Sequence, residues 1–328
     1  PWTVMCSYNL LNGQRMSENA KLFGMLRNEF GFDGLIMSDW DAVKDSAASI
    51  NAGLALEMPY NAQNQQQLLA DVQAGKVNSE MLDYCADQVL SLADKCSESR
   101  KLRKTDMTIE QRREVALDIA REGIVLLKNN DVLPISQPNA SVFVTGAAAW
   151  QYYYGGGSSN VVPETPFMPL AEAMRAEGID AGYHESVWKV DNGGFVNVGN
   201  VAKAQRFAAE ADVTVMCVGN PYSVECEGSD RQHIRLAKDE VEVIHHLARV
   251  ANKMVVCVYA GAAVDMSEWI DEVDAVVWAG YGGQHGNKAL AEVLSGKINP
   301  SGRLTETFPL DLSDVPAENS YRDGAVML

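Results

Sequence analysis

The sequence has no long hydrophobic run. None of its apolar stretches approaches the ~20 residues that a membrane-spanning helix needs, so no such helix is predicted. Basic residues are also few, because 27 Lys and Arg stand against 44 Asp and Glu, giving a net charge of −17. Lys and Arg are outnumbered and do not form the stripes that line a surface suited to a phosphate backbone. We therefore expect neither a membrane nor a nucleic acid as a partner.

Metal-binding and nucleotide-binding patterns are absent as well. The six cysteines form no Cys-x-x-Cys pair, and the five histidines show no ligand spacing apart from the adjacent His245 and His246. The sequence therefore predicts no metal centre and no disulfide framework. It also lacks a Gly-x-Gly-x-x-Gly turn and a P-loop, so we expect no cofactor. The first residues lack the basic segment of a signal peptide, and they indicate no cellular location.

The sequence does contain enough apolar residues, 47% of 328, to build the cores of two domains. Its first hundred residues alternate between strand and helix patterns. Because a closed (β/α)8 barrel takes about 250 residues, only the last units of such a barrel fit into residues 1–98. The expected strands are 4–7, 35–38 and 54–58, and the expected helices are 65–73, 78–96 and one capped by Ser17 that runs to Phe30.

A charged segment without apolar periodicity, residues 99–107, is predicted to be a linker. Residues 108–312 follow as a second domain, in which apolar segments alternate with amphipathic helices as in a doubly wound parallel sheet. Residues 313–328 are expected to be a tail leading to a further segment. The expected strands are 142–145, 213–218, 254–259 and 275–279, and the expected helices are 108–127, 168–177, 203–211, 238–250 and 284–294.

The strand at 35–38 is followed directly by Asp39 and Trp40. Buried parallel strands deliver catalytic side chains at their carboxyl ends, and a carboxylate beside an indole suits a site that cleaves sugars. Asp41 is the nearby alternative carboxylate. A purely structural alternative is that Asp39 caps the following turn.

A second group of carboxylates follows the strand at 213–218. The loop contains Glu225, Glu227 and Asp230, with Arg231 beside them. Taken alone, the loop is interpreted as a solvated acidic segment. Together with Asp39 it offers two carboxylates from two domains, and a cleft between domains is where a retaining glycosidase would hold its nucleophile and its acid/base. Glu225 and Glu227 both stay open as the proton donor.

Five segments, in this order, resemble glycoside hydrolase family 3, which includes many β-glucosidases. The resemblance implies the C-terminal part of a TIM-like (β/α)8 barrel followed by a flavodoxin-like α/β sandwich, an α/β fold throughout. One departure is Ala55, which stands where the family often carries Asp. The segments are Met5-Cys6-Ser7-Tyr8-Asn9, residues 31–40, residues 120–129, residues 225–231 and residues 299–309.

The resemblance also implies roles for single residues. Asp39 becomes the nucleophile and Glu227, the Glu before Gly, becomes the acid/base. Tyr8 would lie beside the nucleophile, and Trp40, Met5 and Ser158 would contact the substrate. Ser158 belongs to a glycine-rich segment, 155–159, for which a phosphate cradle is the weaker interpretation because no Lys-Ser or Lys-Thr follows it.

These observations lead to one functional expectation. The protein is expected to be a retaining exo-acting β-glycosidase. The preferred candidate is a β-glucosidase that releases terminal non-reducing β-D-glucose from glucosides or oligosaccharides. A β-xylosidase, a β-N-acetylhexosaminidase or a non-catalytic sugar-binding protein are the alternatives. Because the first barrel strands are missing, an upstream segment or a complementary polypeptide is expected to complete the barrel.

Overall fold

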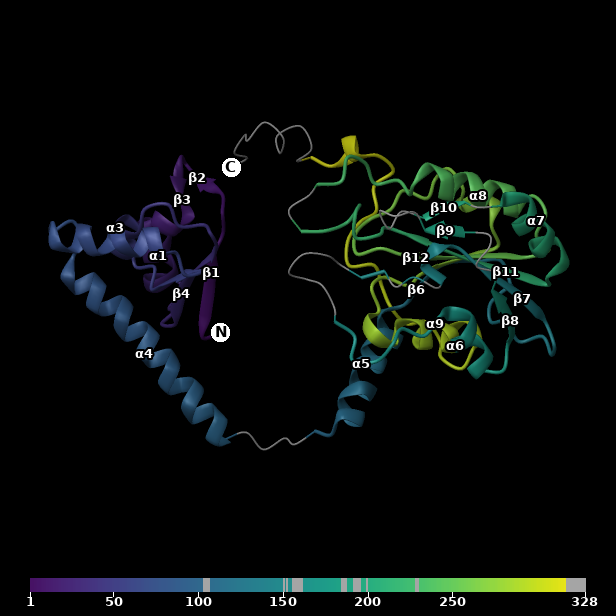
Figure 1. The fold of residues 1–328 in the computed structure, drawn as a ribbon, viewed down its shortest axis with the longest axis horizontal. Coiled ribbons are helices and arrows are strands. Elements are labelled where there is room, and N and C mark those ends of the chain that lie inside the picture. Colours follow the sequence, from purple (N-terminus) through teal and green to yellow (C-terminus); the bar gives the residue numbers. More distant parts are fainter. Residues whose placement is uncertain are drawn as a thin grey trace. The chain divides into compact units, whose positions relative to one another are not determined.

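The structure, a computed structural model, describes residues 1–102, 107–149, 151, 153–154, 162–183, 188–190, 196–198, 200–227 and 230–316. For residues 183, 188–190 and 196–198 the backbone alone is described. The chain folds into two compact units, residues 1–102 and 107–316 of the described part, which are treated separately below (Figure 1). None of the helices in these ranges is long and apolar enough to cross a membrane.

The first unit is built on a parallel sheet of three strands in the order β1-β4-β5. Each strand is followed by at least one helix, so all three carboxyl ends lie at one edge of the sheet. A short hairpin of β2 and β3 follows β1. The strands are β1 (Thr3–Cys6), β2 (Leu10–Leu11), β3 (Gln14–Arg15), β4 (Leu35–Trp40) and β5 (Leu56–Met58); the helices are η1 (Met16–Glu18), α1 (Ala20–Asn28), α2 (Ser46–Ala52), α3 (Ala62–Gln73) and α4 (Ser79–Leu102).

The first helix begins later than the sequence predicts. Ser17 was expected to cap it, but Ser17 lies inside the 3₁₀ turn η1. The N-cap is Asn19, whose Oδ1 accepts a hydrogen bond from the backbone N–H of Leu22 at 3.0 Å. Asn and Ser cap helices equally well, so the residue types alone do not separate the two positions.

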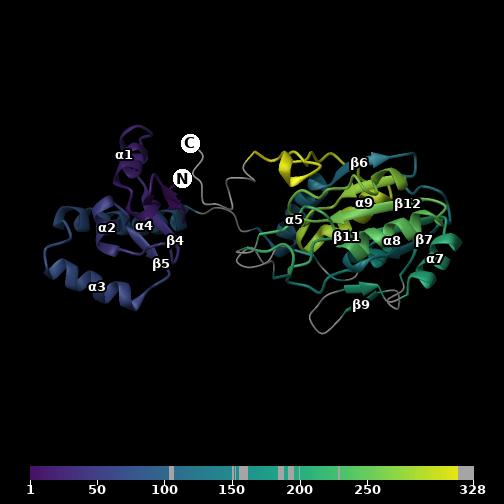
Figure 2. The same ribbon diagram turned by 90° about the horizontal axis from the view of Figure 1, so that it is seen from above.

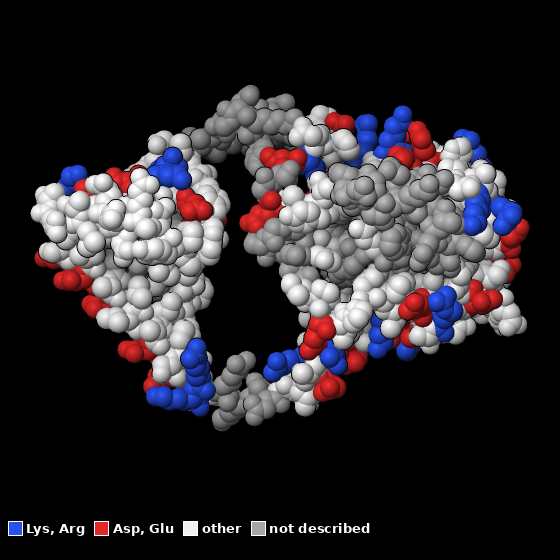
Figure 3. All heavy atoms as spheres, viewed as in Figure 1, with Lys and Arg blue, Asp and Glu red and all other residues white. Residues whose placement is uncertain are grey.

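Helix α4 extends beyond its predicted end. It runs to Leu102, so residues 99–102, predicted to be linker, are helical. Charged residues support this turn, because Lys101 pairs with Glu98 at 2.6 Å and basic residues favour the carboxyl end of a helix dipole. Figure 3 shows carboxylates spread singly along α4 and basic side chains gathered at its last turn.

The second unit contains a six-stranded sheet in the order β6-β13-β12-β11-β7-β8. Helices cover both faces, α5, α6 and α9 on one and α7 and α8 on the other (Figures 1 and 2), and the predicted α/β fold is confirmed. The strands are β6 (Val125–Asn129), β7 (Ser141–Thr145), β8 (Asp180–Tyr183), β11 (Val213–Gly219), β12 (Met254–Tyr259) and β13 (Ala275–Trp278), with a separate pair of β9 (Trp188–Val190) and β10 (Val196–Val198). The helices are α5 (Ile109–Gly123), η2 (Ala147–Ala149), α6 (Leu170–Ala176), α7 (Val201–Glu210), α8 (Lys238–Ala248), η5 (Ile270–Glu272), η6 (Gly283–His285), α9 (Gly286–Leu294) and η7 (Leu312–Asp314).

The sheet differs from the predicted one at its β6 edge. The helix expected over residues 108–127 starts at the predicted capping box of Thr108 and Gln111 but ends at Gly123. Ile124 is extended, and residues Val125–Asn129 form β6, which pairs antiparallel with β13. The sheet is therefore mixed rather than wholly parallel. β-Branched residues after a glycine fit a strand better than a last helical turn.

Burial on both faces explains the apolar runs of the central strands. Along β11, Val215 and Cys217 pack with α6 and α9, whereas Met216 and Val218 pack with α7 and α8. A strand covered on both sides needs apolar residues at every position. This leaves the residues just beyond the strand ends as the first positions where polar groups are tolerated.

Candidate active site

In the first unit, candidate residues gather at the carboxyl edge of the sheet. Strands β1 and β4 pair in parallel with Cys6 opposite Ser38. This register brings the residues that follow β1 alongside the end of β4. Ser38 is fully buried, Asp39 is half-buried and the Trp40 side chain is 58% exposed. The strand thus passes from the core to the surface at Asp39.

Tyr8 and Asp39 are in direct contact. The Tyr8 hydroxyl lies 3.0 Å from Oδ1 of Asp39 and 2.8 Å from the carbonyl oxygen of Trp40. The backbone N–H of Trp40 also donates to Oδ1 of Asp39, at 2.6 Å. Among the described residues, Oδ2 of Asp39 makes no hydrogen bond. One carboxylate oxygen is therefore held in place and the other faces away from these donors.

The turn beneath Asp39 is fixed by β5. Ser38 Oγ accepts from the N–H of Met58 at 2.8 Å, and the N–H of Asp41 donates to the Met58 carbonyl at 2.9 Å. Asp41 has φ +60°, a left-handed conformation that costs a non-glycine residue about 1 kcal/mol or more. Burial raises the pKa of the Cys6 thiol, which stays neutral close to Asp39. The turn that follows Asp39 is therefore held by β5, and the Cys6 thiol adds no charge beside it.

In the second unit, the acidic loop leaves the end of β11 and is anchored through Glu225. Oε1 of Glu225 accepts from the backbone N–H of Gly261 at 2.7 Å, and Oε2 accepts from Nδ2 of Asn220 at 2.8 Å. Nη1 of Arg231 lies 4.0 Å from Oε2 and donates to a backbone carbonyl at 2.9 Å. Both oxygens of Glu225 are thus occupied by donors of their own unit.

Tyr281, which follows β13, adds a further hydrogen bond to this group of residues. Its hydroxyl donates to the carbonyl oxygen of Asn220 at 3.1 Å. Burial, and next the charge of Glu225, raise the pKa of Tyr281, so the hydroxyl remains a donor at any moderate pH. Glu227 lies two residues beyond Glu225 and is exposed. Of the two candidate proton donors, Glu225 is held by the hydrogen bonds described above, and Glu227 has the more exposed side chain.

Of the other two residues predicted to contact the substrate, the structure describes Met5 but not Ser158. Met5 is 56% exposed on β1, on the face opposite Cys6. Ser158 and its glycine-rich segment lie outside the described residues. Sequence reasoning missed Asn220, Gly261 and Tyr281. Each lies within three residues of the end of a parallel strand, the one signal that could have found them.

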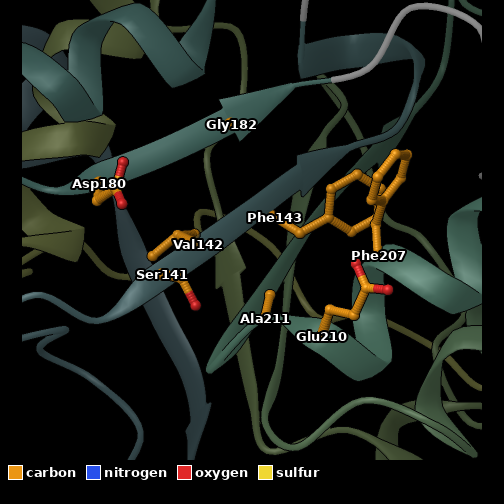
Figure 4. Close-up of a pocket in the computed structure, with 8 residues that line it drawn as sticks. All are labelled: Ser141, Val142, Phe143, Asp180, Gly182, Phe207, Glu210 and Ala211. Carbon is orange, nitrogen blue, oxygen red and sulfur yellow. The ribbon is translucent and has the colours of Figure 1, made fainter.

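A groove of the second unit lies away from these residues. It holds about 270 Å³ and is lined by residues including Ser141, Phe143, Asp180 and Phe207 (Figure 4). Ser141 and Asp180 begin β7 and β8, so the groove sits at the amino ends of these strands. Glu225 and its partners Asn220 and Gly261, by contrast, lie at the carboxyl ends of β11 and β12. The described residues also contain no group of three or more metal-ligating side chains.

Comparison with known families decides the classification. Residues 2–92 match the glycosyl hydrolase family 3 N terminal domain, and residues 124–327 match the glycosyl hydrolase family 3 C-terminal domain. The chain belongs to glycosyl hydrolase family 3. The resemblance noted in the sequence is confirmed, and both units carry their own match.

Individual relatives agree with this family. The chain is 35% identical to thermostable beta-glucosidase B of Acetivibrio thermocellus, covering 97% of this chain and 42% of that protein. It is 33% identical to an exo-alpha-(1->6)-L-arabinopyranosidase of Bifidobacterium longum, covering 97% and 43%. The crystal structure of a GH3 beta-glucosidase from Bifidobacterium adolescentis matches with a TM-score of 0.87 and 33% identity, covering 98% and 47%. The chain thus spans less than half the length of each of these relatives.

Proposed function

We propose that the protein is a retaining β-glycosidase, with Asp39 as nucleophile and Glu227 as acid/base. A β-glucosidase is the preferred candidate. The observation that carries the proposal is the contact of Tyr8 and Asp39. A carboxylate fixed through one oxygen at a strand end, with an exposed indole next to it, suits attack on a sugar ring. Family membership supports hydrolysis of glycosidic bonds as the reaction class.

The proposed reaction has two steps. In the first, Oδ2 of Asp39 attacks the anomeric carbon while Glu227 gives its proton to the departing oxygen, so that a glycosyl ester forms on Asp39. In the second, Glu227 takes a proton from water, and the water oxygen displaces Asp39 from the anomeric carbon. Two inversions at the same carbon retain its configuration.

The proposal includes a finer description of the fold. We assign residues 1–98 to the C-terminal part of a (β/α)8 barrel and residues 108–312 to an α/β sandwich. Three parallel strands in chain order, with helices between them, support the first assignment. In this proposal, the remaining barrel strands come from an upstream segment or a complementary polypeptide.

The choice of sugar is part of the proposal. Glucose is favoured by the relationship to thermostable beta-glucosidase B, and an α-L-arabinopyranoside by the nearly equal identity to the arabinopyranosidase. β-Xylosides and β-N-acetylglucosaminides complete the panel. Turnover of the intact protein on the p-nitrophenyl glycosides of these four sugars ranks the candidates, and no turnover of any would favour a non-catalytic sugar-binding protein.

Variants test the two carboxylates. Asp39→Ala is expected to lower kcat/KM by about a thousandfold or more, because the nucleophile is removed. Glu227→Ala is expected to lose turnover and to regain part of it with azide, which attacks the glycosyl ester without needing a base. Asp83→Ala is the matched control, since Asp83 is exposed on α4 of the same unit as Asp39. Unchanged turnover in Asp39→Ala, or in Glu227→Ala without azide, would contradict that residue's assignment.

A further inference from the structure

Glu225 and its partner Asn220 together connect the ends of three neighbouring strands. Oε2 of Glu225 is bound by Asn220, which follows β11, and Oε1 by the N–H of Gly261, which follows β12. Tyr281, which follows β13, donates to the carbonyl oxygen of Asn220. Asn220 is 2% exposed. A carboxylate that satisfies a buried amide and a backbone N–H together is expensive to remove, because both donors would be left unpaired.

Gly261 and the Tyr281 ring also leave no free space beside the Glu225 carboxylate. A Cβ atom on Gly261 would come within 2.5 Å of Oε1 of Glu225 and 2.7 Å of a ring carbon of Tyr281. Real Cβ atoms do not approach other atoms so closely, so a side chain at Gly261 would displace Glu225 or Tyr281. The glycine therefore fits this position because the Glu225 carboxylate needs the room.

We propose that Glu225 is a positioning residue for proton transfer, which holds the segment carrying Glu227 against the carboxyl edge of the sheet. The inference rests on the proposed function, in which Glu227 is the acid/base. Glu225 is two residues from Glu227, and both its oxygens are bound within its own unit. Glu225 therefore fixes the position of the loop, and Glu227 transfers the proton. A misplacement of about 1 Å in a catalytic group costs about a hundredfold in rate.

The proposal has a kinetic signature. A proton donor matters most when the departing oxygen is strongly basic, as in an alkyl glycoside, and least when it is an activated phenolate. A misplaced Glu227 should therefore slow cleavage of an alkyl glycoside and spare a dinitrophenyl glycoside. A loss of folded protein would reduce both rates by the same factor.

Two variants disturb the anchor independently. In Glu225→Gln, the side-chain oxygen can still accept from Gly261, but the charge is lost and the new amide pairs with Asn220 only if the Asn220 amide turns over. Gly261→Ala keeps the carboxylate and displaces it or the Tyr281 ring that packs beside it. Glu172→Gln is the matched control, because Glu172 is exposed on α6 of the same unit.

The measurement is kcat/KM of the intact protein for methyl and 2,4-dinitrophenyl β-D-glucoside. In Glu225→Gln and Gly261→Ala we expect a fall of about tenfold or more on the methyl glucoside and less than about threefold on the dinitrophenyl glucoside. Glu172→Gln should change neither. Equal losses on both substrates in both variants, or no loss on either, would overturn the proposal.

Separate variants distinguish this inference from the proposed function. If Glu227→Ala keeps full activity on the methyl glucoside, the acid/base assignment itself fails. If azide rescues Glu225→Ala and does not rescue Glu227→Ala, Glu225 is the proton donor and its positioning role is wrong. If Glu227→Ala behaves as an acid/base variant while Glu225→Gln matches the wild type, only the positioning role fails.

Discussion

The hydroxyl of Tyr8 contacts Oδ1 of Asp39 at 3.0 Å, although the two residues are 31 positions apart in the chain. The contact arises from the sheet, because parallel pairing of β1 with β4 sets Cys6 opposite Ser38. Residues just beyond these two positions then lie at the same edge. The register of these two paired strands thus determines which groups surround the candidate nucleophile.

The first prediction concerns this hydroxyl. Tyr8→Phe removes the donor to Asp39 and keeps the ring, so kcat/KM for the preferred glycoside should fall about tenfold, the loss of one hydrogen bond to a charged group. The melting temperature should not change, because Tyr8 is 56% exposed. Tyr60→Phe is the control, since the Tyr60 hydroxyl bonds only to Gln65 among described partners, at 2.8 Å. Equal activity of the two variants would contradict the role of Tyr8.

A second prediction concerns a close backbone approach in the second unit. Gly146 has φ +98°, and a Cβ atom there would lie 2.0 Å from the carbonyl oxygen of Cys217. Gly178 has φ +85°, and a Cβ atom there would have no other atom within 4 Å. Gly178→Ala should cost only the left-handed conformation, about 1 kcal/mol, whereas Gly146→Ala should cost about 3 kcal/mol or more. Urea unfolding followed by circular dichroism measures both, and similar losses would contradict the close approach.

A third prediction concerns the ion pair between α5 and α9. Arg121 binds both oxygens of Glu292, at 2.5 and 2.8 Å, and Glu292 is fully buried. Among the described residues, Arg121→Met leaves this carboxylate with Lys297 alone at 3.1 Å, and it should lower the free energy of unfolding by about 3 kcal/mol. Lys238→Met is the control, because its pair with Glu242 is exposed.

The pH dependence of the same pair follows from its pKa. The hydrogen bond from Arg121 lowers the pKa of Glu292, so the stabilisation is present above the ordinary pKa of a glutamate and is lost as pH falls through the lowered value. The difference between wild type and Arg121→Met should therefore shrink in acid. A difference that is constant down to pH 3 would contradict the ion-pair account.

Sequence patterns predicted the central strands well and the sheet edge poorly. Apolar runs such as that of β11 identify strands buried on both faces, since no other element needs them at this length. Strand β6 was missed because its residues continue the apolar pattern of α5, and only pairing with β13 makes them extended. Likewise Glu225 was recognised as acidic, but its bond to Gly261 joins two strand ends that no local pattern connects.

A fourth prediction concerns the buried acid Glu240 at the start of α8. Burial raises the pKa of Glu240 to about 8, above its ordinary value of 4.5, and Oε1 accepts one long hydrogen bond, 3.4 Å, from Gly219. Oε2 has no hydrogen-bond partner among the described residues. The folded protein then keeps a proton that the unfolded chain releases, so stability should fall as pH rises from about 4.5 to about 8.

Replacing the acid removes this dependence. Glu240→Gln should gain about 3 kcal/mol over the wild type between pH 4.5 and pH 7, measured as free energy of unfolding at the two values. Glu242→Gln on the same helix is exposed and should follow the wild type at both. A Glu240→Gln profile parallel to that of the wild type would show that Glu240 is charged in the folded protein.

The most direct test of the central claim is to trap the sugar on its nucleophile. A 2,4-dinitrophenyl 2-deoxy-2-fluoro glycoside of the preferred sugar reacts in the first step, and its fluorine slows the second, so a retaining enzyme accumulates the glycosyl ester. Trypsin then releases residues 28–44, which include Asp33, Asp39 and Asp41. Tandem mass spectrometry should place the sugar on Asp39. A label on Asp41 or on another peptide, or no label on a protein that turns over the unfluorinated glycoside, would contradict Asp39 as the nucleophile.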